Sequence, residues 1–444
     1  MASRMQNDCE GFFRRDFLRI GAGAGLLGLS LPELLRLEAM AAKKGANQPA
    51  KKADSVIMVW LAGGPATIDM WDLKPEAPEG IRGAFKPADT NVPGIRISEH
   101  MPKMAKVADK ISIIRSIYHS IPSHGPATVF MTTGNKPTAA LQYPAMGSVV
   151  SKVLAPRPGV PQYVSFSDIR GGLAGNSGYL GTAYSPFMVE GNPNGGKTTL
   201  RVRGIQLPTN FTLDSLANRD DLLAGFDSTF RETDKNADLV QGFDAFHKQA
   251  LEILRSDKTR NAFDLTQEKQ ETRARYGMEA FGQSALAARR LVEAGVRFVT
   301  ISIGGWDTHG KTFEAHSKRL QPTLDNTLSA LIADLSDRGM LDRTMVYCAG
   351  EFGRTPKINK NDGRDHWARS MSVVAAGGGF KRGYAHGTTD GQGMAPATEA
   401  CLPDDVSSTI FHNLGIDPKT ELQTSTGRPI TLFREGAVID KLLA

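Results

Sequence analysis

The sequence predicts an α/β protein: a mostly parallel sheet sandwiched by helices, with a loop-rich insertion. Three observations support this fold class. Short apolar runs rich in β-branched residues recur along the chain, as expected for strands buried on both faces. Segments with helical periodicity lie between several of these runs, and glycine with charged residues follows most of them directly. The predicted strands are 54–61, 111–116, 298–303, 344–349 and 371–376.

Helical periodicity predicts the elements that cover the sheet. Two of these segments stop at glycine, Gly295 and Gly415, as a helix with a left-handed C-cap does. Residues 142–242 are irregular and rich in Gly, Pro and Asn, so we expect an insertion or small cap over the site. The predicted helices are 101–110, 124–133, 243–255, 267–276, 283–294, 320–338 and 403–414.

Composition limits the class of protein. With 444 residues, 40% apolar and 23% charged, the chain can bury one large core or two. The net charge is +6, but acids and bases are interleaved and no basic run is paired with aromatics, which argues against a nucleic-acid binder. A mildly basic surface suits anionic substrates and cell-envelope polyanions equally. Three cysteines, one of them near the N-terminus, imply no disulfide framework.

The N-terminus resembles an export signal. Arg14-Arg15 lies in a twin-arginine consensus, and the weakly apolar segment 20–35 that follows is too short for a stable membrane span. Ala39-Met40-Ala41 offers a cleavage site. An amphipathic helix with a chance arginine pair is the alternative. We expect export by the twin-arginine machinery to the periplasm or beyond, with a signal peptide at 1–41, a linker at 42–53 and a folded domain at 54–444.

Metal-ligand residues follow the third and fourth predicted strands. Asp307 and His309, two residues apart, follow 298–303, and carboxylate oxygen with imidazole suits zinc, manganese or iron. The stretch 344–379 predicts a strand, a polar loop and a second strand. An ordinary polar loop is the alternative for this stretch. The loop carries Glu351, Arg354, Asp365 and His366.

Further candidates follow the first two strands. Gly63 and Gly64 allow close approach of backbone to a ligand, without a dinucleotide-binding fingerprint. Asp69 and Asp72 come next, as metal ligands or as turn caps. His124 begins a predicted helix, as a ligand, an acid, a nucleophile or a plain surface residue. Because parallel strands end at one sheet edge, we expect His124 to face Asp307 and Glu351.

The motifs in combination resemble a known family. The chain is similar to a large exported family, domain-of-unknown-function family 1501, and more loosely to the alkaline phosphatase and sulfatase superfamily. The first resemblance covers most of the mature chain and implies an alkaline phosphatase-like fold. The motifs are Gly63-Gly64-Pro65, Asp69-x-Trp71-Asp72-x-Lys74-Pro75, Gly305-Trp306-Asp307-Thr308-His309, Gly350-Glu351-Phe352-Gly353-Arg354-Thr355-Pro356 and Gly363-Arg364-Asp365-His366-Trp367.

Two segments depart from the superfamily pattern. The nucleophile slot would hold His124 and the arginine slot Thr128. The Asp-His-Gly that closes a strand in those enzymes stands here as Glu351-Phe352-Gly353, so Asp365-His366 would supply the missing imidazole from the loop.

The resemblance implies an exported metal-dependent hydrolase of phosphate or sulfate esters. The cofactor would be a divalent metal, zinc before manganese, calcium or iron, and the reaction would be attack by water assisted by that metal. Arg354 or His124 would steady the anion of a small-molecule or glycan substrate. A non-catalytic envelope protein that binds an anionic glycan or a protein partner is the alternative. The metal candidates are Asp307, His309, Glu351, Asp365 and His366, with Asp69 and Asp72.

Overall fold

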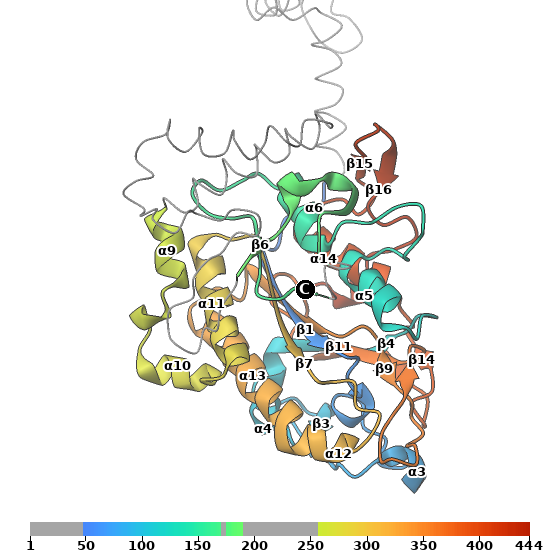
Figure 1. Cartoon of the computed structure of the whole chain (residues 1–444). Helices are drawn as coiled ribbons and strands as arrows, with labels where there is room; N and C mark the ends of the chain where they lie inside the picture. The colour runs from blue at the N-terminus through green and yellow to red at the C-terminus, as the bar shows by residue number, and fades with distance from the viewer. Residues whose placement is uncertain (1–47, 170–174, 190–255) are drawn as a thin grey trace, which may run out of the picture. The chain divides into compact units, whose positions relative to one another are not determined.

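The computed structural model in Figure 1 describes residues 48–169, 175–189 and 256–444. Within it, Lys51–Ala444 forms one compact unit. The predicted signal peptide, the first part of the predicted linker and the helix predicted at 243–255 lie outside the described residues. Among the described residues, no helix is long and apolar enough to cross a membrane.

An eight-stranded sheet with the order β12-β4-β11-β8-β1-β7-β5-β6 organises this unit. All five predicted strands are present, with ends within one residue of those expected. Every pair of neighbours is parallel except the two that involve β11, so the prediction of a mostly parallel sheet is confirmed. The strands are β1 (Ser55–Ala62), β4 (Ile111–Ile117), β5 (Tyr163–Ser165), β6 (Phe187–Met188), β7 (Phe298–Gly304), β8 (Thr344–Ala349), β11 (Met371–Ala376) and β12 (Tyr384–His386).

Strand β11 runs against its neighbours because of its connection to β8. Parallel neighbours need a crossover segment that returns the chain to the opposite end of the sheet. Residues 350–370 contain no helix and instead fold into a two-stranded ribbon of β9 (Gly353–Arg354) and β10 (His366–Trp367). The chain therefore re-enters the sheet at the edge where it left.

Helices cover both faces of the sheet (Figure 1). Side chains of β1 alternate: Ile57 and Val59 belong to one apolar core, Met58 and Trp60 to the other. Both cores are needed because the central strand has no solvent face, which is why its sequence is continuously apolar. The first core includes α4 (Pro102–Ala105), α11 (Ala280–Ala294) and α13 (Gln321–Asp337); the second includes α5 (His124–Thr133), α6 (Met146–Val153) and α14 (Pro403–Asn413).

The remaining described elements are short. The helix predicted at 101–110 is divided into α4 and a 3-10 turn, Ala108–Lys110, while α5 and α11 end as expected at left-handed glycines, Gly134 and Gly295. A π-helical turn, His316–Leu320, precedes α13. The others are α3 (Glu79–Arg82), α9 (Asp257–Phe263), α10 (Gln270–Tyr276), α12 (Thr312–Ala315), and the strand pairs β2 (Pro87–Asp89) with β3 (Arg96–Ser98), β13 (Thr388–Thr389) with β14 (Pro396–Thr398), and β15 (Glu421–Gln423) with β16 (Pro429–Thr431).

The first part of the range predicted as an insertion, 142–242, belongs to the main sheet and its helical cover. Its α6 packs in the second core, and β5 and β6 extend the sheet in parallel beyond β7. Residues 190–242 lie outside the described part of the chain.

Candidate metal centre

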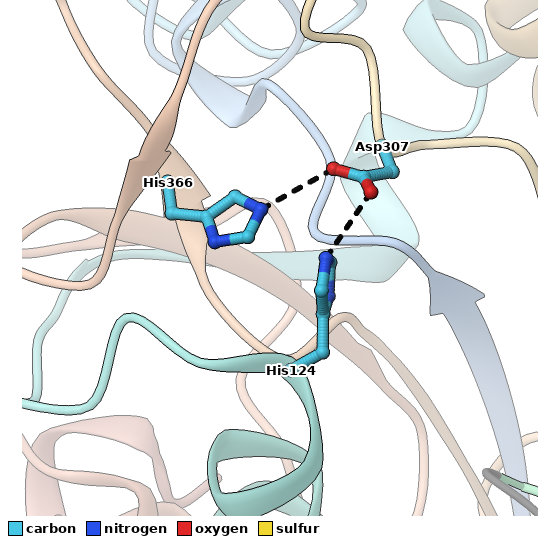
Figure 2. A group of neighbouring side chains, drawn as sticks. All are labelled: His124, Asp307 and His366. Carbon is cyan, nitrogen blue, oxygen red and sulfur yellow. Dashed lines mark hydrogen bonds and ion pairs between the residues drawn. The ribbon is translucent and has the colours of Figure 1, made fainter.

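The predicted site residues lie at one edge of the sheet, beyond the carboxyl ends of β4, β7 and β8. His124 is the first residue of α5 after β4, Asp307 follows β7, and Glu351 follows β8. His366 comes from the β9–β10 ribbon between β8 and β11. In Figure 2 the side chains of His124, Asp307 and His366 point toward one another from three separate segments. The position predicted for His124 is confirmed: its ring centroid lies 4.4 Å from that of His366.

Three of these side chains bring potential ligand atoms to one point. One atom each from His124, Asp307 and His366 lie within 4.8 Å of one another. His124 Nε2 is 3.2 Å from Asp307 Oδ2, and His366 Nε2 is 3.3 Å from Oδ1 (Figure 2). His309 adds a third imidazole, with Nε2 3.1 Å from Asp307 Oδ1 and 3.0 Å from His366 Nε2. We call these four residues the His–Asp cluster.

Each imidazole of the cluster is held through its other nitrogen. His124 Nδ1 lies 2.7 Å from Glu351 Oε1, and His309 Nδ1 lies 2.7 Å from Asp365 Oδ1. His366 Nδ1 lies 2.9 Å from a main-chain carbonyl oxygen in the loop before α5. Carboxylates and carbonyls accept hydrogen bonds, so Nδ1 of each ring must donate. A neutral ring therefore presents the lone pair of Nε2 to the cluster.

These hydrogen bonds leave only acceptor atoms facing one another at the centre of the cluster. Three Nε2 lone pairs meet the carboxylate of Asp307, which also only accepts, so protons or a cation must lie among them. Burial, together with the charge of Arg354, lowers the pKa of His366, which opposes added protons there. Imidazole nitrogens with one carboxylate oxygen, each imidazole oriented by a hydrogen bond from behind, form the donor set of zinc and related ions in proteins. The residues present fit a divalent metal.

Arg354 secures Asp307 and not a substrate anion. Its guanidinium is buried and donates to Asp307 and to the carbonyl oxygens of Gly63, Gly64 and Arg364. The sequence suggested Arg354 or His124 as the group that steadies the anion. Because the Arg354 side chain is fully buried and four of its five N–H donors bond inside the protein, the structure favours a supporting role for Arg354 behind Asp307.

The carboxylate of Asp307 stays ionised. Burial by itself would raise its pKa, but the hydrogen bond and charge of Arg354, with the nearby His124, lower the pKa to about 2. A carboxylate of this kind is available to a cation throughout the physiological pH range.

Glu351 and Asp365 lie behind the imidazoles. The carboxylate of Glu351 is fully buried and accepts from the backbone N–H of Gly63 at 3.1 and 3.2 Å as well as from His124. Asp365 accepts from His309, and that hydrogen bond lowers the pKa of Asp365. Both were predicted as ligands, but the structure places them as the groups that fix the tautomer and orientation of a ligand.

Asp69 and Asp72 are engaged elsewhere, so their predicted role as metal ligands is corrected. Asp69 ends a 3-10 turn and forms a buried ion pair with Arg364, at 2.7 and 2.8 Å from the two oxygens. Asp72 accepts from Lys74 at 2.9 Å and from the hydroxyl of Thr389. Each carboxylate is neutralised by a neighbouring cation before any metal could use it.

Two further residues support the cluster. The buried ring of Phe352 packs against the rings of both His124 and His366, at centroid distances of 4.9 and 4.5 Å. His119 is buried, which lowers its pKa, and its Nε2 donates to the main-chain oxygen of Glu351 at 2.9 Å. Phe352 belongs to one of the sequence motifs and His119 to none, and nothing in the sequence spacing indicated what either residue contacts.

Comparison with known proteins assigns the family. Residues 53–443 match the model of a family described as "Protein of unknown function (DUF1501)". The chain belongs to this family. A comparison with curated proteins finds no match.

Solved structures with partial similarity come from several enzymes. They include the PsFucS1 sulfatase from Pseudoalteromonas sp. (14% identity, 87% of this chain and 72% of that chain, TM-score 0.36). They also include the lipoteichoic acid synthase LtaP from Listeria monocytogenes (11%, 87% and 76%, 0.34) and TAB5 alkaline phosphatase (11%, 83% and 99%, 0.34). TM-scores below 0.5 do not establish an activity, so the function must be argued from the residues of this chain.

Proposed function

We propose that the chain is a metal-dependent hydrolase of phosphate or sulfate esters, exported by the twin-arginine machinery to the periplasm or beyond. The observation that carries the proposal is the convergence of three imidazole lone pairs on the ionised Asp307 carboxylate, each ring fixed by an acceptor behind it. Export is inferred from the N-terminal Arg14-Arg15 motif and is part of the proposal.

The cluster provides the atoms that would bind the metal, and the residues behind it fix the orientation of those atoms. His124, Asp307 and His366 would hold the metal, with His309 as a fourth ligand and zinc the first candidate. A divalent ion in this place would polarise an ester oxygen and make water a better nucleophile. Glu351 keeps the His124 ring in one tautomer by accepting from its Nδ1–H. The ligand atoms are thereby oriented before any substrate arrives.

Metal content and turnover test the proposal together. We expect the purified protein to bind zinc or another divalent ion, lose it to a chelator, and hydrolyse phosphate or sulfate esters only when reloaded. Asp307→Ala should abolish both binding and turnover. Asp342→Ala is the matched control, since Asp342 is an exposed carboxylate paired with Arg382 outside the cluster. A wild-type protein that binds no divalent metal would falsify the proposal.

A non-catalytic binding protein is the second candidate. The slot for a covalent nucleophile holds His124, whose two ring nitrogens are directed to Glu351 and to the cluster. A protein that loads metal normally but turns over no phosphate, sulfate or phosphonate ester would favour this candidate, with an anionic glycan or a protein as partner.

A further inference from the structure

A cavity of about 580 Å³ opens beside the cluster, at the carboxyl end of β4. Buried side chains, Phe130 and His119, belong to its lining, and exposed Tyr118 and two cations stand at its rim. Its volume falls in the range of small-molecule sites, and most of its wall is apolar. We call it the β4 pocket; its lining includes Tyr118, His119, Phe130, Lys136, Arg369 and Leu402.

The β4 pocket and the His–Asp cluster share the same sheet edge and the same chain segments. In the sheet, β4 and β8 are separated only by β11, so their ends are about 10 Å apart at the usual strand spacing. Ser120 in the pocket wall is four residues before His124, and Arg369 is three residues after His366. His119, in the pocket lining, donates to the main-chain oxygen of Glu351, and the carboxylate of Glu351 accepts from His124. The β4 pocket and the cluster are therefore neighbours at this end of the sheet, joined through residues of the same segments.

The rim of the pocket carries positive charge that the protein leaves largely uncompensated. Among the described residues, no carboxylate pairs with Arg369, whose guanidinium stacks 5.9 Å above the ring of Trp367. The indole N–H of Trp367 donates to Met394 at 2.8 Å, which fixes that platform. Lys136 approaches only the exposed Glu435, at 3.5 Å, a surface pair of small energy. An apolar wall with cations at its rim suits an organic anion with an aromatic or other apolar body.

We propose that the β4 pocket binds the organic part of the anionic ester whose phosphate or sulfate group lies at the His–Asp cluster. This rests on the proposed function, which it deepens by naming the substrate class: esters of aromatic or similarly apolar alcohols, in preference to small aliphatic ones. Arg369 then contacts the aromatic body of the substrate, and Arg369 and Lys136 together favour substrates that carry a further negative charge on that body.

Calorimetric titration of chelated and metal-loaded protein with 4-nitrophenyl sulfate, 4-nitrophenyl phosphate, inorganic sulfate and inorganic phosphate tests this. The aryl esters should bind more tightly than the bare anions. Arg369→Ala, and Ala400→Trp at the exposed wall position Ala400, should each weaken aryl-ester binding about tenfold and leave inorganic-anion binding unchanged. The control Arg428→Ala, an exposed arginine next to β16, should change neither.

The possible results distinguish failure of the pocket proposal from failure of the hydrolase proposal. If Asp307→Ala abolishes turnover while Arg369→Ala and Ala400→Trp leave the KM of aryl esters unchanged, the pocket proposal is overturned and the hydrolase proposal stands. If aryl esters bind, the pocket variants weaken that binding, and no ester is turned over, the pocket stands and the hydrolase proposal fails. Both pocket substitutions are at exposed positions, and circular dichroism checks that each variant is folded.

Discussion

At the scale of single residues, the site consists of pairs in which one member faces the cluster and the other fixes it. His124 with Glu351 and His309 with Asp365 are such pairs, both joined at 2.7 Å. In metalloproteins these outer partners set the tautomer and the basicity of the imidazole, and their loss costs about 10–100-fold in metal affinity.

Glu351→Gln should therefore weaken zinc binding by about 10–100-fold while the protein stays folded. The amide keeps the shape of the carboxylate but loses the charge that strengthens the hydrogen bond from His124 Nδ1. Competition with a fluorescent chelator measures the affinity. Glu314→Gln, an exposed residue of α12 paired with Lys318, should leave it unchanged. If Glu351→Gln binds zinc as the wild type does, Glu351 has no part in orienting the ligand.

The burial of His316 should make the stability of the protein depend on pH. It is fully buried beside Trp306, and burial, with the charges of Arg364 and Arg354, lowers its pKa to about 3. The unfolded chain, with an ordinary histidine pKa of about 6.5, takes up the proton first as pH falls. The stabilising effect of the neutral ring is thus complete above pH of about 6.5 and declines below it, by at most about 1.4 kcal/mol per pH unit.

Chemical unfolding between pH 7 and pH 4.5 tests this dependence. His316→Phe should show a shallower loss of unfolding free energy than the wild type over that interval, whatever its stability at neutral pH. The partly exposed His412 gives the control: His412→Gln should keep the wild-type slope. Equal slopes for His316→Phe and the wild type would remove His316 as the cause.

Spacing in the sequence identified most members of the site but not their roles. Asp307, His309, Asp365 and His366 were predicted because they follow strands or lie in the loop between two of them, and the structure brings all four together. Whether Asp365 or the adjacent His366 faces the cluster depends on side-chain rotamers and on hydrogen-bond partners far away in the sequence. For that reason the orienting role of Asp365 was not predictable.

At the scale of elements, the turn after β1 allows two loops to approach one another. Gly63 has φ +120°, and a Cβ there would lie 2.5 Å from the backbone nitrogen of Asp307. Its own N–H donates to Glu351. The same glycine thus supports a ligand from one side and an orienting carboxylate from the other.

Gly63→Ala should destabilise the protein by about 1–3 kcal/mol from the strained backbone alone. It should also weaken metal binding, because the loop that carries Asp307 must move. Thermal unfolding and zinc titration measure the two effects. Gly80→Ala is the matched control: in α3 no atom lies within 4 Å of the added methyl group, so its melting temperature should stay level or rise slightly. A Gly63→Ala protein with wild-type stability and affinity would contradict the close approach.

The strands that could be predicted are those that are buried over most of their length. β1, β8 and β11 are predominantly apolar along their whole length because helices cover both of their faces. β5 and β6 have only three and two residues, and they exist through pairing with neighbours, a contact that leaves no local pattern. The direction of β11 depends on how residues 350–370 fold, which periodicity does not report.

At the scale of the whole molecule, the protein needs no disulfide in the described part of the chain. Cys348 lies in the central sheet and Cys401 before α14, both as free, buried thiols. Burial raises the pKa of Cys348 far above its usual range and that of Cys401 to about 12, so neither is a reactive thiolate.

Thiol titration should therefore find no rapidly reacting Cys348 or Cys401 in the folded protein and find both after unfolding in denaturant. The third cysteine, Cys9, belongs to the predicted signal peptide. A secreted, processed chain should then contain two thiols and begin at Ala42 by mass spectrometry. Three thiols in protein recovered from the periplasm would contradict the predicted cleavage.

The cluster has one further consequence, which concerns how the molecule assembles. His124 is 183 residues from Asp307 and 227 from Glu351, and Arg354 is 291 from Gly63. Contacts of such long sequence separation close late in folding, because the loop entropy must be overcome first. A partly folded chain in which only β8, the β9–β10 ribbon and β11 had formed would hold Glu351 and His366 without their partners. If the cluster binds a metal as proposed, strong binding would thus be a property of the finished fold, and an incompletely folded copy would have little means of competing for the ion.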